Sequence, residues 1–161
     1  MVKAIESLRG KVVAVPENRQ LILLSNMLRK RGADVIAVPM IAILDAPDSE
    51  PILSWIKDFI RMPPDILILL TGEGLRRLIK LAEKNGLKAD FIKVLSKVNK
   101  LCRGPKPNQA LREIGLEREL DAQSPTTDGV ITSLNELELS GKNIAVQLYG
   151  EEPNVKLISY L

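Results

Sequence analysis

Residues 97–116, KVNKLCRGPKPNQALREIGL, decide how this chain is interpreted. They predict a short apolar strand over 98–102, a turn over 103–107 and an amphipathic helix that ends just before Gly115. A proline suits the first helical turn, where its missing N–H would have no partner, and a glycine suits the left-handed stop. The segment therefore has the strand–turn–helix order of an α/β protein.

The turn carries groups that suit an anion. Gly104 lets the backbone approach a ligand closely. Arg103 and Lys106 lie beside the start of the helix, where free N–H groups attract negative charge. We take Arg103, Gly104, Pro105 and Lys106 as candidate binding residues. The same residues also fit an ordinary strand–helix connection with two surface cations, and the turn alone does not separate these interpretations.

Composition excludes several classes of function. The 161 residues are 45% hydrophobic and 27% charged, enough for one domain with a real core plus part of another. The absence of histidine excludes Ser-His-Asp and Cys-His catalysis and every histidine-containing metal site. The single cysteine, Cys102, is expected to be a buried small hydrophobe. Aromatic residues make up only 3% and the net charge is +3, so no nucleic-acid partner is expected.

Apolar strands alternate with amphipathic helices along the chain. Residues 11–16 and 35–39 enclose a helix that Gly32 ends, forming a βαβ unit, and residues 40–49 begin extended and turn polar like a connector. Further strands are predicted at 66–70, 98–102, 119–121 and 143–148. The main strands are continuous aliphatic runs, which is typical of a parallel sheet covered on both faces. No apolar run approaches 18 residues and no signal-peptide pattern is present, so we expect a cytoplasmic protein without a membrane partner.

Helix starts are predicted from capping residues. Glu17 and Asn18 suit the start of the first helix, and Ser49 with Pro51 suits the second. Thr126 is a suitable N-cap for a helix that buries Val130 and the apolar residues following it.

Strand-to-helix turns in an open parallel sheet all lie at the carboxyl ends of the strands, where ligands bind. In this chain those turns collect glycines, hydroxyls and cations, whereas the glycines of the opposite turns are interpreted only as helix stops. No catalytic group stands out. The candidate substrate-binding residues are Thr71, Gly72, Arg103, Gly104, Pro105, Lys106, Thr126, Thr127 and Gly150.

Known nucleotide motifs do not fit. Residues 72–74, GEG, lack the third glycine of a dinucleotide fingerprint, and no GxxxxGK[ST] occurs. Glu151 and Glu152 suit either a paired-carboxylate site or, more simply, solvated surface glutamates. The cations within 76–80, RRLIK, fit either a binding surface or, more simply, a solvated helix face.

Four motifs, in this order, resemble the uroporphyrinogen-III synthase family. They are ILILLTGEGLRRLI at 66–79, CRGPKPNQALREIGL at 102–116, SPTTDGVITSL at 124–134 and GKNIAVQLYGE at 141–151. The opening βαβ unit is similar as well. The resemblance implies a flavodoxin-like α/β lobe with a parallel sheet and helices on both faces, plus the opening βαβ of a second lobe. Residues 1–40 would belong to lobe 1, 41–45 to a connector and 46–161 to lobe 2.

The resemblance also implies a reaction. Hydroxymethylbilane, a linear tetrapyrrole, would be closed to uroporphyrinogen III with inversion of one ring and loss of water, in haem and cobalamin biosynthesis. It implies a small-molecule tetrapyrrole partner, no metal or organic cofactor, and a monomer. The last helix reaches Leu161 without a cap, so we expect a truncated chain that lacks the C-terminal part and is inactive alone.

Two departures from the family pattern bear on function. Gly72 stands where the family has serine, and Pro107 stands where it often has threonine. They favour an alternative function, a non-catalytic tetrapyrrole-binding or regulatory module of the same fold. A receiver-like signalling domain is a third alternative, but neither Val12–Pro16 nor Ile66–Leu70 ends in the acidic cluster that a Mg²⁺-binding phosphorylation site requires.

Overall fold

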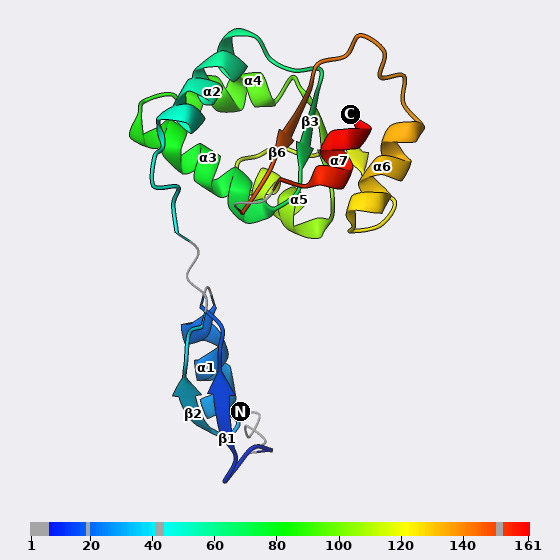
Figure 1. Cartoon of the computed structure of the whole chain (residues 1–161). Coiled ribbons are helices and arrows are strands. Elements are labelled where there is room, and N and C mark those ends of the chain that lie inside the picture. Colours follow the sequence, from blue (N-terminus) through cyan, green and yellow to red (C-terminus); the bar gives the residue numbers. More distant parts are fainter. Residues whose placement is uncertain (1–6, 19, 41–43, 151–152) are drawn as a thin grey trace. The chain divides into compact units, whose positions relative to one another are not determined.

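A computed structural model describes residues 7–18, 20–40, 44–150 and 153–161 of the chain. Its contacts divide the chain into two compact units, Met1–Ala46 and Pro47–Leu161. Figure 1 gives the order of the elements, and the two units are described separately below.

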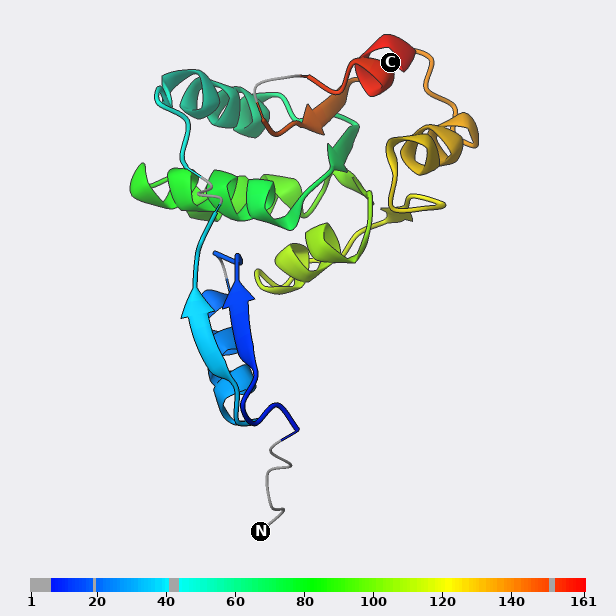
Figure 2. The same ribbon diagram turned by 60° about the horizontal axis from the view of Figure 1, so that its bottom comes forward.

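The first unit is a βαβ unit. Strands β1 (Val12–Val15) and β2 (Asp34–Ala37) are parallel neighbours, and helix α1 (Leu21–Arg29) packs on them. Figure 2 shows the two strands side by side. Val15 and Ala33 are buried, whereas Val12 and Ile36 remain more than half exposed.

The expected cap of α1 is wrong. Gln20 is the N-cap residue of this helix, and its side chain makes no capping hydrogen bond. Glu17 and Asn18 instead interact with each other, because the Asn18 N–H donates to the Glu17 carboxylate at 3.0 Å. These two residues therefore shape the turn before the helix rather than its first turn.

The second unit contains one four-stranded parallel sheet in the order β5-β4-β3-β6. The register aligns Ile66 of β3 with Asn99 of β4 on one side and with Ile144 of β6 on the other. The elements of this unit are α2 (Glu50–Arg61), β3 (Ile66–Leu69), α3 (Gly72–Lys84), α4 (Lys88–Leu95), β4 (Asn99–Cys102), α5 (Pro105–Arg112), β5 (Leu120–Asp121), α6 (Thr127–Asn135), β6 (Ile144–Gln147) and α7 (Val155–Tyr160).

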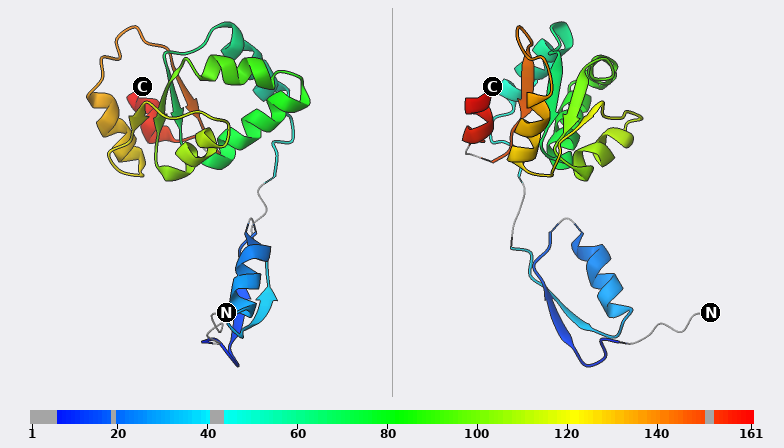
Figure 3. Two further views of the ribbon diagram at one scale, coloured as in Figure 1. Left: turned by 180° about the vertical axis from the view of Figure 1, so that it is seen from behind. Right: turned by 90° about the vertical axis from the view of Figure 1, so that its right-hand side faces the viewer.

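Alternate residues of β3 supply two separate cores, as the two-residue period of a strand requires. Leu67 and Leu69 join a cluster with α2, α3, α4 and α5, whereas Ile66 and Ile68 join a cluster with α6 and α7. Figure 3 shows the two groups of helices on opposite sides of the sheet. The parallel-sheet α/β fold with helices on both faces is therefore confirmed. No helix among the described residues is long and apolar enough to cross a membrane.

Strand β4 contains a buried lysine, which the expected apolar strand does not predict. Lys100 is 1% exposed, and its ammonium group donates to the carbonyl oxygens of Leu95 (3.0 Å) and Val98 (2.7 Å) and to the Glu119 carboxylate (3.0 Å). The other oxygen of Glu119 accepts from the Lys100 N–H at 2.7 Å. Three acceptors around an ammonium with three protons leave none of its donors unused.

Candidate functional site

All four strands of the second unit run in the same direction, so the turns that follow them lie at one edge of the sheet. We call residues 70–74, 103–107, 122–127 and 148–150 the carboxyl edge. After β5 the chain passes through α6 and crosses to the other side of β3, where β6 pairs with β3. The strand order therefore reverses between β3 and β6, and open α/β sheets bind ligands at such a position.

Thr71 caps α3 and also joins two turns of the carboxyl edge. Its hydroxyl oxygen accepts from the Gly74 N–H at 3.0 Å. The hydroxyl and the N–H of Thr71 both donate to Oε1 of Gln147, at 3.1 Å and 3.0 Å. The hydroxyl proton of Thr71 is therefore committed to Gln147 at the end of β6.

Gly72 and Gly74 permit close packing across this edge. A Cβ on Gly72 would lie 2.4 Å from the carbonyl oxygen of Lys106 at the start of α5. A Cβ on Gly74 would lie 2.2 Å from the carboxamide carbon of Gln147. Both distances are shorter than any normal contact, so the glycines bring α5 and the end of β6 against the first turn of α3.

Arg103 links the ends of three strands. Its N–H donates to the Leu69 carbonyl oxygen at 3.0 Å, which continues the pairing of β4 with β3. Its guanidinium donates to the Tyr149 hydroxyl at 3.1 Å and lies 5.4 Å from the centre of that ring. Because β3 lies between β4 and β6, this side chain spans the end of β3.

The start of α5 offers fewer free N–H groups than the sequence suggests. Gly104 is the N-cap, and Pro105 and Pro107 both fall in the first turn, where neither carries an N–H. The N–H groups of Gly104 and Lys106 are left in this stretch, and the Lys106 side chain is exposed. Gly104 is extended, and a Cβ there would lie 3.3 Å from Pro125. The missing Cβ therefore faces the neighbouring turn of the same edge.

The turn before α6 is held by hydroxyl groups. Thr126 is the N-cap, as predicted, and its Oγ1 accepts from the Gly129 N–H at 3.0 Å and lies 2.8 Å from the Ser124 hydroxyl. The Thr127 hydroxyl oxygen accepts from the side-chain amide of Asn154 at 2.8 Å. Thr127 thereby keeps its own hydroxyl proton for another acceptor.

Gly150 lies at the end of the turn after β6 with a φ of 79°, a left-handed conformation that favours glycine. It is exposed, as is Tyr149 beside it. Glu151 and Glu152, the candidate carboxylate pair, lie outside the described residues.

The nine candidate residues thus all lie on the carboxyl edge, whose turns touch one another. Sequence reasoning missed Gln147, Tyr149 and Asn154, which connect these turns. One signal was available for Gln147, because it is the polar residue that ends the otherwise apolar strand β6.

Two arginines expected on a solvated helix face are in ion pairs. Arg76 of α3 makes two 2.7 Å bonds to Glu113 just after α5, and the pKa of Glu113 is lowered by the Arg76 hydrogen bond. Arg77 bonds Glu73 one turn earlier at 2.9 Å. The Arg76–Glu113 ion pair connects α3 to the end of α5. It adds to the contact between Gly72 and the backbone of α5.

Cys102 is buried at the end of β4, as expected. Burial raises the pKa of its thiol to about 12. The thiol is therefore protonated at neutral pH and is a packing group rather than a nucleophile.

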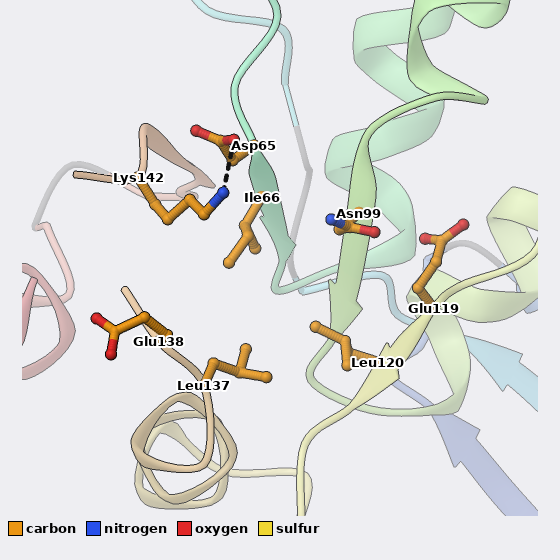
Figure 4. A pocket seen from close by; sticks show the side chains of 8 residues that line it. All are labelled: Asp65, Ile66, Asn99, Glu119, Leu120, Leu137, Glu138 and Lys142. Atoms are coloured by element: carbon orange, nitrogen blue, oxygen red, sulfur yellow. Dashed lines mark hydrogen bonds and ion pairs between the residues drawn. The ribbon is translucent and has the colours of Figure 1, made fainter. Parts of the chain in front are cut away.

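A cavity of about 260 Å³ lies at the opposite, amino-terminal edge of the sheet (Figure 4). Its acidic groups already have partners. Asp65 accepts from the Asn143 N–H at 2.9 Å and pairs with Lys142, and these bonds lower the pKa of Asp65. Glu119, also on its wall, holds Lys100. This cavity therefore lies at a structural junction of β3, β4 and β6, away from the carboxyl edge.

The chain matches the model of the family described as uroporphyrinogen-III synthase HemD over residues 23–161. A curated relative, "Uncharacterized protein YjjA" of Bacillus subtilis, is 34% identical over 149 residues, which are 91% of this chain and 54% of the relative.

Solved structures agree with this match. Uroporphyrinogen III synthase of the extremely thermophilic bacterium Thermus thermophilus superposes in a mutant form with a TM-score of 0.69 at 24% identity, covering 94% of this chain and 57% of that one. The wild-type form gives 0.60 at 25% identity, covering 94% and 56%. The chain thus spans about half the length of the relatives it matches. The resemblance seen in the turn motifs is confirmed, and the chain belongs to the uroporphyrinogen-III synthase family.

Proposed function

We propose that the carboxyl edge binds the carboxylate side chains of a tetrapyrrole and that the chain contributes this edge to a uroporphyrinogen-III synthase-like lyase. The reaction would close hydroxymethylbilane to uroporphyrinogen III, invert one pyrrole ring and release water. We propose a cytoplasmic monomer that needs no metal or organic cofactor, with this 161-residue chain by itself binding the ligand but inactive in the complete reaction.

The observation that carries this proposal is the interlocked carboxyl edge, in which the turn with Arg103 and Lys106 touches the turns that follow β3 and β5. A substrate with eight carboxylates can form charge-assisted hydrogen bonds with such cations, and these are about twice as strong as neutral ones. The proton of Thr127, left available by Asn154, would be a further donor. The remaining proposed contacts are Thr71, Gly72, Gly104, Pro105, Thr126 and Gly150.

The chemistry would rest on holding a folded ligand rather than on a strong acid or base. The chain has no histidine, and its one thiol is kept protonated by burial. Positioning and fixed electrostatics would then supply most of the rate acceleration. Such an edge would accelerate ring closure by holding a linear tetrapyrrole with its two ends close together, because the ends must meet before the ring closes.

Binding is tested by titrating the chain with uroporphyrin III, a stable octacarboxylic porphyrin, and following its absorption. Arg103→Ala and Lys106→Ala should each raise the Kd about tenfold, the usual scale for losing a hydrogen bond to a charged group. Lys97→Ala is the control, because Lys97 is exposed near the amino end of β4. Absence of binding by the unmodified chain would refute the proposal.

A second candidate is a non-catalytic tetrapyrrole-binding module of the same fold. It is favoured by Gly72, which leaves no room for the serine of the family, and by the commitment of the Thr71 proton to Gln147. Such a module would select the cyclic product.

Enzymatically prepared hydroxymethylbilane separates the two candidates, because it closes spontaneously to the type I isomer. A lyase edge that holds the linear substrate should yield type III isomer or slow the formation of type I. A module that binds only the cyclic product should bind uroporphyrin III and leave the rate of type I formation unchanged.

A further inference from the structure

Gln147 borders the carboxyl edge and makes three hydrogen bonds with it. It is the last residue of β6 and is 7% exposed. Its Oε1 accepts from the N–H and the hydroxyl of Thr71, at 3.0 Å and 3.1 Å, and its Nε2 donates to the carbonyl oxygen of Leu148. One carboxamide therefore fixes both the turn after β3 and the first residue after β6.

The space around this carboxamide is closed on the side of α3. A Cβ added to Gly74 would lie 2.2 Å from both Cδ and Nε2 of Gln147. The amide thus fills the position between β3 and β6 at which the strand order reverses. It occupies this position because the first turn of α3 has a glycine there.

We propose that Gln147 is the positioning residue of the carboxyl edge, holding Thr71 and the turn 148–150 in the arrangement that receives the ligand's carboxylates. This inference rests on the proposed function. Tyr149 lies two residues beyond Gln147 and accepts the hydrogen bond of Arg103. Gln147 therefore sets the direction of the Arg103 guanidinium through Tyr149, without touching the ligand itself.

Holding Thr71 and the turn 148–150 together requires an amide side chain. The two Thr71 donors need an acceptor, and the Leu148 carbonyl oxygen needs a donor, and a carboxamide supplies both. An ionised glutamate supplies only the acceptor, whereas a protonated glutamic acid supplies both groups again. Leucine has a similar size and supplies neither.

This difference defines the experiment. Uroporphyrin III is titrated into the unmodified chain, Gln147→Leu and Gln147→Glu at pH 8 and pH 5, and each Kd is divided by that of the unmodified chain at the same pH. Gln147→Leu should raise the Kd about tenfold at both pH values, as expected when buried donors lose their acceptor. Gln147→Glu should bind weakly at pH 8 and recover toward the unmodified chain at pH 5, because burial at this 7% exposed position raises the pKa of a carboxyl above its usual value. Gln109→Leu, on the exposed side of α5, is the matched control and should not change the Kd.

Gly74→Ala provides an independent variant, because it displaces the carboxamide without removing it. It should raise the Kd as Gln147→Leu does, with the far-UV circular dichroism unchanged. If the unmodified chain does not bind the porphyrin, the proposed function fails and this inference fails with it. If the unmodified chain binds and Gln147→Leu binds within about twofold of it, the positioning role alone is overturned. Equal losses for Gln147→Glu at both pH values would also overturn it, because a merely structural defect would not be rescued by protonation.

Discussion

Replacing Gly72 with serine, the residue that the family pattern has there, should destabilise the protein by about 1–3 kcal/mol, the usual cost of forcing extra atoms into filled space. The new Cβ would lie 2.4 Å from the Lys106 carbonyl oxygen and 2.9 Å from its carbonyl carbon. Reaching an ordinary contact of 3.4 Å requires an opening of about 1 Å (3.4 minus 2.4) between α3 and α5. The opposing atoms belong to the backbone of the first turn of α5, so no side-chain rotation relieves the clash.

Gly104→Ser is the matched control. Gly104 is also a glycine of the carboxyl edge with φ outside the left-handed region, but a Cβ there would meet only the exposed Pro125, at 3.3 Å. Gly104 is the N-cap of α5, a position where serine is preferred. This variant should therefore stay within about 0.5 kcal/mol of the unmodified chain, the usual range for surface changes.

Urea unfolding followed by tryptophan fluorescence measures both variants. Trp55 is the chain's only tryptophan, and its ring lies 5.2 Å from that of Phe59 in the core beneath α3 and α4, so the signal reports the second unit. A loss below about 0.5 kcal/mol for Gly72→Ser, or equal losses for both variants, would refute the packing argument, because only the space around the new atoms distinguishes the two sites.

Three further predictions concern the interior. Lys100→Met should lower the free energy of unfolding by about 2–4 kcal/mol, because buried carbonyl oxygens and Glu119 lose their donor, and the exposed Lys97→Met should not. Cys102 should resist iodoacetamide at pH 8.5 until urea unfolds the chain. Folding raises the pKa of this thiol from 9.0 to about 12, so its contribution to the free energy of unfolding is complete below pH 9 and is lost as the pH rises toward 12. In urea titrations at alkaline pH, Cys102→Ala should therefore lose less stability with rising pH than the unmodified chain. Leu111→Ala, at a fully buried position of α5, should cost about 2–5 kcal/mol in the same unfolding assay, and a loss below about 1 kcal/mol would contradict its burial.

The features that could be predicted from the sequence are those set by local pattern. Aliphatic runs locate the strands. Thr126 is recognisable as a helix cap because threonine is a preferred N-cap before an apolar helical pattern, and its hydroxyl accepts from the Gly129 N–H. The burial of Lys100 could not be predicted from the local sequence pattern. A lysine in a strand is normally expected at the surface, and its burial depends on Glu119, which lies 19 residues away and supplies the opposite charge.

The roles of the glycines could not be predicted for the same reason. Gly104 is expected to let a ligand approach the backbone, and Gly72 is expected to be a binding residue of the same edge. In the structure Lys106 lies against Gly72 and Pro125 lies against Gly104, each from the turn of a neighbouring strand. A glycine in the sequence marks a close approach, but only the sheet order identifies what approaches it.

The hydrogen bonds of the carboxyl edge change which groups can act on a ligand. A hydroxyl that caps a helix uses its oxygen to accept an N–H, and Thr71 also gives its proton to Gln147. Prolines remove N–H groups from the start of α5. The side chains that retain donors for a polyanion are therefore chiefly the cations Arg103 and Lys106 and the hydroxyl of Thr127. If the proposed tetrapyrrole binds here, its affinity should depend on charge more than on hydroxyl groups and should fall as salt is added, because charge–charge attraction at exposed groups is screened.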